Sequence, residues 1–108
     1  MPQGGKGAIW YHRQVAEVYL SPDIAFPQYE KLQRDPRRTG AFRRVNEILD
    51  ALEDDPRQRW LRTQRFRDPP LWCTGFDTDG EAWVILWSHD EEDEDRILVD
   101  YIGTASFG

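Results

Sequence analysis

The sequence has a single cysteine, Cys73, among 108 residues, so no disulfide can form within the chain. A domain of this length can bury a core without disulfides, and a lone cysteine is compatible with a reducing compartment. No apolar run approaches the roughly 20 residues that a membrane-spanning helix needs. Residues 1–7 are polar and glycine-rich, without the apolar stretch of a signal peptide, so we expect a flexible tail over residues 1–8. These absences favour one cytoplasmic domain, residues 1–108, without a membrane partner.

Positive charge is scarce in one half of the chain only. Residues 1–70 carry 13 Lys and Arg against 10 Asp and Glu, whereas residues 71–108 carry one Arg against 10 acids. The halves therefore have net charges of +3 and −9, which together give the −6 of the whole chain. An acidic protein of this kind can still present a local basic face to phosphate. The alternative is that both halves carry charges that only face solvent.

The first half of the chain has the pattern of a strand followed by two helices. Residues 15–20 alternate in the manner of a strand. Ser-Pro-Asp at residues 21–23 predicts a helix start, because serine caps free N–H groups and proline fits a first turn. This helix should run toward residue 33 and end before Pro36. Residues 41–53 predict a second helix, whose apolar face comprises Phe42, Val45, Ile48, Leu49 and Leu52.

The second half has the pattern of a sheet. Residues 57–68 are rich in arginine and fit either a short helix or an irregular strand. Strands are predicted over residues 71–76, 82–87 and 97–102, with a glycine-containing turn at residues 77–80. The middle strand is apolar at every position and should be covered on both faces. The sequence therefore predicts an α+β fold with an N-terminal strand, a helical hairpin and a C-terminal antiparallel β-meander.

Three segments together resemble the RelE/ParE toxin superfamily. They are VAEVYLSP at residues 15–22, VNEILDALEDDP at residues 45–56, and the pair AWVILW and ILVDYIG at residues 82–87 and 97–103. The resemblance implies the toxin of a bacterial type II toxin–antitoxin system, an mRNA endonuclease that needs no metal. It also implies an antitoxin protein that fills the groove between helices and sheet, and contact with mRNA or the ribosome.

The match lacks the residues that RNA-cleaving members of the superfamily use. Those members place Arg or Lys on the meander strands and His, Tyr or Arg after the closing glycine. Here one strand offers Trp72, Cys73 and Thr74, and Gly103 is followed by Thr-Ala-Ser-Phe, none of which is a useful acid or base near neutral pH. The alternative is a non-catalytic interaction protein with this fold, either a toxin directed at gyrase or an acidic protein inhibitor.

An arginine series is the main candidate for binding RNA. It is interleaved with aromatic residues, so that guanidinium groups would hold phosphates while Trp60 stacks an unpaired base. The series comprises Arg57, Arg59, Arg62, Arg65 and Arg67. If RNA is cleaved, we expect Arg62 and Arg65 at the scissile phosphate and His89, or else His12, to move protons. The alternative is that these arginines pair with acids of the chain itself.

Other reactive groups have simpler interpretations. Six consecutive acids, residues 90–95, lack the ligand spacing of a calcium loop and predict a solvated hairpin loop. Cys73 lies on an apolar strand, where a packed thiol is expected rather than a nucleophile. We therefore expect no metal and no small-molecule cofactor.

Overall fold

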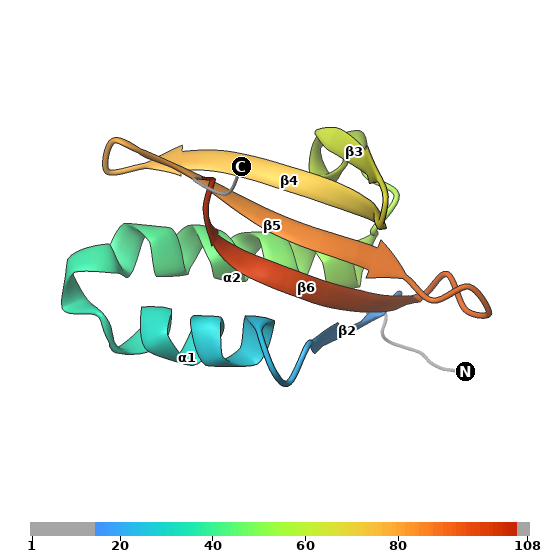
Figure 1. Ribbon diagram of the computed structural model, residues 1–108, viewed down its shortest axis with the longest axis horizontal. Helices are drawn as coiled ribbons and strands as arrows, with labels where there is room; N and C mark the ends of the chain where they lie inside the picture. The colour runs from blue at the N-terminus through green and yellow to red at the C-terminus, as the bar shows by residue number, and fades with distance from the viewer. Residues whose placement is uncertain (1–14, 106–108) are drawn as a thin grey trace, which may run out of the picture.

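The computed structural model describes residues 15–105 as two helices packed on one face of a five-stranded sheet (Figure 1). The elements are β2 (Glu17–Leu20), α1 (Ala25–Arg34), the short 3-10 helix η1 (Pro36–Arg38), α2 (Thr39–Asp54), a second 3-10 helix η2 (Arg59–Leu61), β3 (Gln64–Arg67), β4 (Pro70–Thr78), β5 (Glu81–His89) and β6 (Arg96–Thr104). This is the predicted α+β class and order. Within the described residues, no helix has the length and apolar character needed to cross a membrane. The predicted tail over residues 1–8, Trp10, His12 and Phe107 lie outside the described part of the chain.

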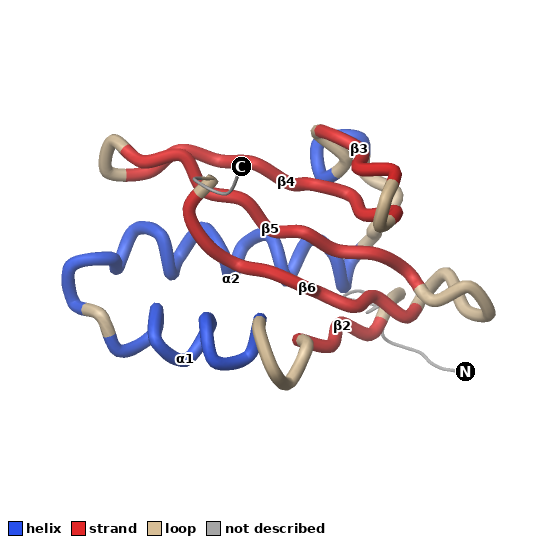
Figure 2. The backbone as a smooth tube through the Cα atoms, in the orientation of Figure 1, coloured by secondary structure: helices blue, strands red, loops and turns tan. Residues whose placement is uncertain are grey.

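The sheet is mixed, with the strand order β2-β6-β5-β4-β3 (Figure 2). Strands β3 to β6 are antiparallel, whereas β2 runs parallel to β6. A parallel pair cannot be joined by a tight turn. Here both helices and the strands β3 to β5 lie between β2 and β6 along the chain. The meander has one strand more than predicted. The arginine-rich segment that fitted either a helix or a strand contains both, namely η2 and the edge strand β3.

The core lies between α2 and the sheet. Ala41, Val45, Ile48 and Leu52 of α2 are at most 1% exposed. Their spacing of four, three and four residues keeps them on one side of the helix. The predicted apolar face included Phe42 and Leu49, which are only partly buried. The buried face of α2 therefore includes Ala41 rather than Phe42. The sequence alone did not distinguish between these two orientations of the helix.

The first helix begins later than predicted, at Ala25 rather than around residue 22. Ser21 still satisfies a free N–H group, because its Oγ accepts a hydrogen bond of 2.9 Å from the backbone of Ala25. Pro27, not Pro22, occupies the first helical turn, where its missing N–H leaves no intrahelical bond unmade. The helix ends at Arg34, and Asp35 is extended before Pro36, as predicted.

The hairpin between β4 and β5 turns over two residues. Asp79 and Gly80 both have positive φ, 53° and 78°, and Thr78 pairs with Glu81. This is the backbone of the tight turn that suits the twist of antiparallel strands. The strand that follows is buried on both faces from Trp83 to Trp87, as its uninterrupted apolar sequence predicted.

Candidate functional site

The predicted arginine series begins with a residue that is already neutralised. Arg57 contacts three carboxylates, with N–O distances of 3.1 Å to Asp95, 3.6 Å to Asp55 and 3.7 Å to Glu94. The hydrogen bond that Arg57 donates to Asp95 is the main reason that the pKa of Arg57 is raised, and the charges of the nearby carboxylates add to it. Pairing with the chain's own acids, the alternative drawn from the sequence, therefore applies to Arg57. Because Asp95 and Glu94 belong to the hairpin between β5 and β6, these pairs also attach that hairpin to the end of α2.

Two further arginines lie on one indole ring. The guanidinium carbon of Arg62 is 4.9 Å from the ring centroid of Trp72, and that of Arg65 is 4.6 Å from it. Arg62 also lies 5.8 Å from the Trp87 ring, and its Nε donates a hydrogen bond of 3.1 Å to the carbonyl of Pro56. A cation over an aromatic face keeps its outer N–H groups available to a ligand. Trp72 on β4 is thus the platform that positions both arginines, a role that the sequence did not suggest.

The remaining members of the series are exposed to solvent. No ion pair is recorded for Arg59 or Arg67 among residues 15–105. Trp60, which was expected to stack a base, is 47% exposed, and its indole donates a hydrogen bond of 3.0 Å to Gln58. The short helix η2 and strand β3 carry most of these groups at one edge of the sheet. The contacts of the five arginines differ, however, so the series does not form a single patch. It separates into a neutralised arginine, two stacked arginines and two free ones.

His89 lies in the same hollow as two of the arginines. This hollow has a volume of about 170 Å³ and is lined by Pro56, Arg57, Arg62, His89 and Glu94. The ring nitrogen Nδ1 of His89 lies 3.4 Å from the carbonyl oxygen of Asp90. The structure therefore places His89 and Arg62 in one hollow. Arg65 shares the Trp72 ring with Arg62 but is not among the described residues that line this hollow. A guanidinium beside an imidazole and a carboxylate can hold an anionic group and move a proton on it.

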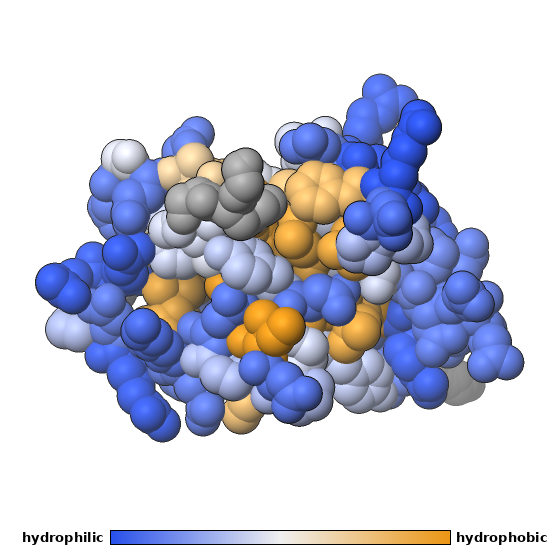
Figure 3. All heavy atoms as spheres, in the orientation of Figure 1, coloured by the Kyte–Doolittle hydropathy of each residue, from blue (hydrophilic) through white to orange (hydrophobic). Residues whose placement is uncertain are grey.

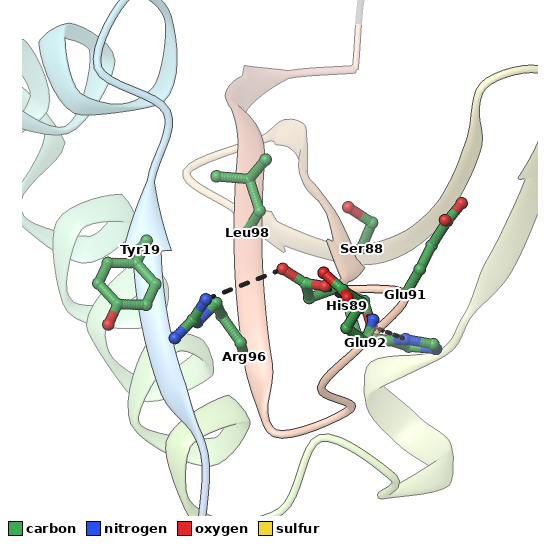
Figure 4. Close-up of a pocket in the computed structure, with 8 residues that line it drawn as sticks. Tyr19, Ser88, His89, Glu91, Glu92, Arg96 and Leu98 are labelled. Atoms are coloured by element: carbon green, nitrogen blue, oxygen red, sulfur yellow. Dashed lines mark hydrogen bonds and ion pairs between the residues drawn. The ribbon is translucent and has the colours of Figure 1, made fainter.

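A larger hollow of about 520 Å³ opens on the helix-free face of the sheet (Figure 4). Tyr19 and Leu98 form its apolar wall, while Asp90, Glu91 and Glu92 from the β5–β6 hairpin supply negative charge. Among the described residues, Arg96 is the one Lys or Arg of its lining, 4.0 Å from Asp90. The acidic hairpin, predicted as a solvated loop, therefore makes ion pairs as well as facing solvent. Among the described residues, no cluster of three or more His, Cys, Asp or Glu side chains is placed to hold a metal ion.

The helix-free face of the sheet carries a second, smaller apolar cluster. Cys73, Val84 and Leu86 are buried there, with Phe66, Leu71 and Tyr101 packed around them. The space-filling view shows orange apolar atoms exposed between blue polar groups on this face (Figure 3). Burial raises the pKa of the Cys73 thiol, which fits the packed role predicted for it rather than that of a nucleophile. Strands β4 and β5 carry no Lys or Arg, so these two strands place no cation on this face.

Comparison with protein-family models, with curated proteins and with solved structures finds no match to this chain.

Proposed function

We propose that this chain is the toxin-like member of a bacterial toxin–antitoxin pair, located in the cytoplasm, and that it cleaves mRNA without a metal ion. The observation that carries the proposal is the hollow that brings Arg57 and Arg62 against His89. The order of elements, a strand, two helices and a meander closed by the parallel β2–β6 pair, supports the resemblance to the RelE/ParE superfamily. An antitoxin protein would be the partner that neutralises the activity.

The reaction at this site is attack by a ribose 2′-hydroxyl on the adjacent phosphate. Arg62, assisted by Arg65, binds the phosphate oxygens and stabilises the charge that develops on them. His89 accepts the proton of the 2′-hydroxyl while the new P–O bond forms. The bond to the 5′-oxygen breaks, and that oxygen takes up a proton from water, which leaves a 2′,3′-cyclic phosphate and a 5′-hydroxyl end.

Induction of the protein alone in a bacterial culture tests the proposal. Growth arrest with new RNA ends in primer extension is expected for the wild type. His89→Gln should lower the cleavage rate by about 10²- to 10⁴-fold, because it removes the proton acceptor and keeps a polar side chain. Arg62→Lys should lower it too, because lysine keeps the charge but loses the planar fork.

Arg43 supplies the matched control. It is an exposed arginine on α2, far along the chain from the hollow, and no ion pair is recorded for it within residues 15–105. Arg43→Ala should leave cleavage unchanged, and circular dichroism should show that all variants are folded. Unaltered cleavage by both His89→Gln and Arg62→Lys would remove the assignment of this hollow as the site.

A second candidate is a non-catalytic interaction protein, either a gyrase-directed toxin or an acidic inhibitor of another protein. The acidic hollow beside Tyr19 and Leu98, together with a helix-free sheet face that has no cation on β4 or β5, favours this candidate. Growth arrest with intact RNA, accompanied by loss of gyrase supercoiling in an extract, would support the gyrase-directed form. Normal growth with well-folded protein would support the inhibitor.

A further inference from the structure

A basic hollow lies at the other end of β5, between the end of α1 and the end of β6. Its volume is about 320 Å³, within the range of sites for small ligands. Lys31, Arg37 and Arg38 line it, and Asp35 is the one carboxylate among the described residues of the lining. Trp83, which also lines it, is six residues before His89 on the same strand, roughly 20 Å away at the rise of a β-strand. This hollow is therefore separate from the site proposed for RNA cleavage.

The charge of the lining is +2 in a protein whose net charge is −6. The backbone N–H of Arg37 donates a hydrogen bond of 2.9 Å to Asp35 and lowers its pKa, so this carboxylate stays ionised. Arg38 lies between Asp35, at 3.5 Å, and Glu81, at 2.7 Å. No ion pair is recorded for Lys31 within the described residues, and the Arg37 side chain is 88% exposed. Lys31 and Arg37 can therefore turn toward a ligand without breaking a buried interaction.

The wall of the hollow holds a donor without an acceptor. Trp83 is 5% exposed, and its indole Nε1 is buried with no hydrogen-bond partner among residues 15–105. A buried donor left unpaired is destabilising, so such groups are uncommon in folded proteins. The guanidinium of Arg38 lies 5.1 Å from the centroid of the same ring. An anion bound by Arg38 would therefore lie close to the Trp83 ring.

Gln28 adds a second donor. Its Oε1 accepts a hydrogen bond of 2.7 Å from the backbone N–H of Ile102 on β6. With the oxygen engaged, the remaining polar group of this side chain is its NH₂, which only donates. Leu32 and Ile102 supply apolar surface beside these donors. The lining thus offers cations, neutral donors and an apolar wall, the combination that suits an anionic group on an organic body.

We propose that this hollow binds a phosphate monoester. Its +2 lining matches the dianion that such a group carries near neutral pH, and guanidinium forks fit phosphate oxygens. The apolar wall would take the organic part of the ligand. The Trp83 ring is already stacked on Phe76, with centroids 6.2 Å apart, and covered by Arg38, so the described part of the hollow offers no free aromatic face for a base.

The indole signal of Trp83 in ¹H–¹⁵N spectra reports on the hollow directly, once it is assigned by its disappearance in Trp83→Phe. We expect ribose 5-phosphate to move this signal in a saturable manner at constant ionic strength, and inorganic phosphate to do so more weakly. Dimethyl phosphate, a monoanionic diester, should bind at least about 5-fold more weakly, because it carries half the charge. Lys31→Ala and Arg37→Ala should each weaken binding by about 3- to 10-fold.

Arg43→Ala again serves as the control, since it removes a cation of the same type from α2 outside the hollow. An unmoved Trp83 signal at about 50 mM ribose 5-phosphate, a concentration that fills even a millimolar site, would overturn the proposal. Equal binding of the diester would overturn the monoester class and point to the backbone of a nucleic acid. Equal weakening by Arg43→Ala would show that only the overall charge matters. Because no RNA cleavage enters the measurement, its outcome is independent of the function proposed above.

Discussion

A buried chain of hydrogen bonds should decide how firmly the arginine-bearing segment is held on the sheet. The indole of Trp87 on β5 donates to the hydroxyl of Thr74 on β4 at 2.9 Å, and that hydroxyl donates to the carbonyl of Leu61 in η2. All three residues are at most 1% exposed. The hydroxyl of Thr74 therefore connects two strands to the turn that precedes Arg62, and no water reaches it to take its place.

Replacing Thr74 by valine removes the hydroxyl and keeps the shape. The Trp87 N–H and the Leu61 carbonyl would then both be buried without a partner, and each such group costs about 1–3 kcal/mol. We expect the free energy of unfolding to fall by roughly 2–6 kcal/mol. Thr74→Ser keeps the hydroxyl and loses one methyl group, which should cost only about 1 kcal/mol. At about 4 °C per kcal/mol, the valine variant should melt roughly 8–24 °C below the wild type.

Urea unfolding followed by circular dichroism measures these differences, and a double-mutant cycle locates their origin. In Trp87→Phe the donor is already absent, so adding Thr74→Val should cost about 1–2 kcal/mol less than it does in the wild type. The argument fails if Thr74→Val is no less stable than Thr74→Ser, or if the two substitutions in the cycle add without coupling. Either result would mean that Trp87 and Leu61 find other partners when the hydroxyl is gone.

Two further predictions concern the sheet and α2. Desolvation raises the pKa of Asp100, against the opposing effect of a hydrogen bond from Ser88, so the folded state holds this proton more tightly than the unfolded state. The wild type should therefore lose stability as pH rises from about 4 through the raised pKa of Asp100. Thermal melting should show that Asp100→Asn is more stable than the wild type at pH 7 and equal to it at pH 3. Ile48 is fully buried and Leu49 only partly, so Ile48→Ala should cost about 2–4 kcal/mol in urea unfolding and Leu49→Ala about half as much; equal losses would contradict the observed orientation of α2.

The elements with a strong local signal were predictable from sequence. Helix α2 has a clear apolar period, and β5 has a short apolar run after a turn, which favours a strand covered on both sides. The Asp79-Gly80 turn has residues that tolerate positive φ. The segment holding η2 and β3 lacked such a signal, because three of the four residues of β3 are exposed. Its strand form depends on pairing with β4, a contact that local sequence does not encode.

The arginine series shows the same limit at the level of the site. Spacing along the chain grouped five arginines, yet the fold gives neighbouring members different environments. Arg62 and Arg65 are three residues apart and share the Trp72 ring, whereas Arg57 is held by carboxylates from 37 and 38 residues further along. Sequence gave no reason to select Trp72 among five tryptophans, because its role comes from strand pairing. The basic hollow at Lys31 was missed for a similar reason, since α1, η1 and the end of β6 build it jointly.

The pairing of Arg57 with its own acids does not exclude a role in binding phosphate. Its partners are largely exposed, with Glu94 at 73% and Asp95 at 47%. Ion pairs of this kind contribute only about 0–1 kcal/mol each, whereas a charge-assisted bond to a phosphate in a partly enclosed hollow is stronger. An incoming phosphate could therefore displace Glu94 and take its place on Arg57. The same exchange would remove one of the two ion pairs that join the acidic hairpin to Arg57, so occupation of the hollow should loosen residues 90–95.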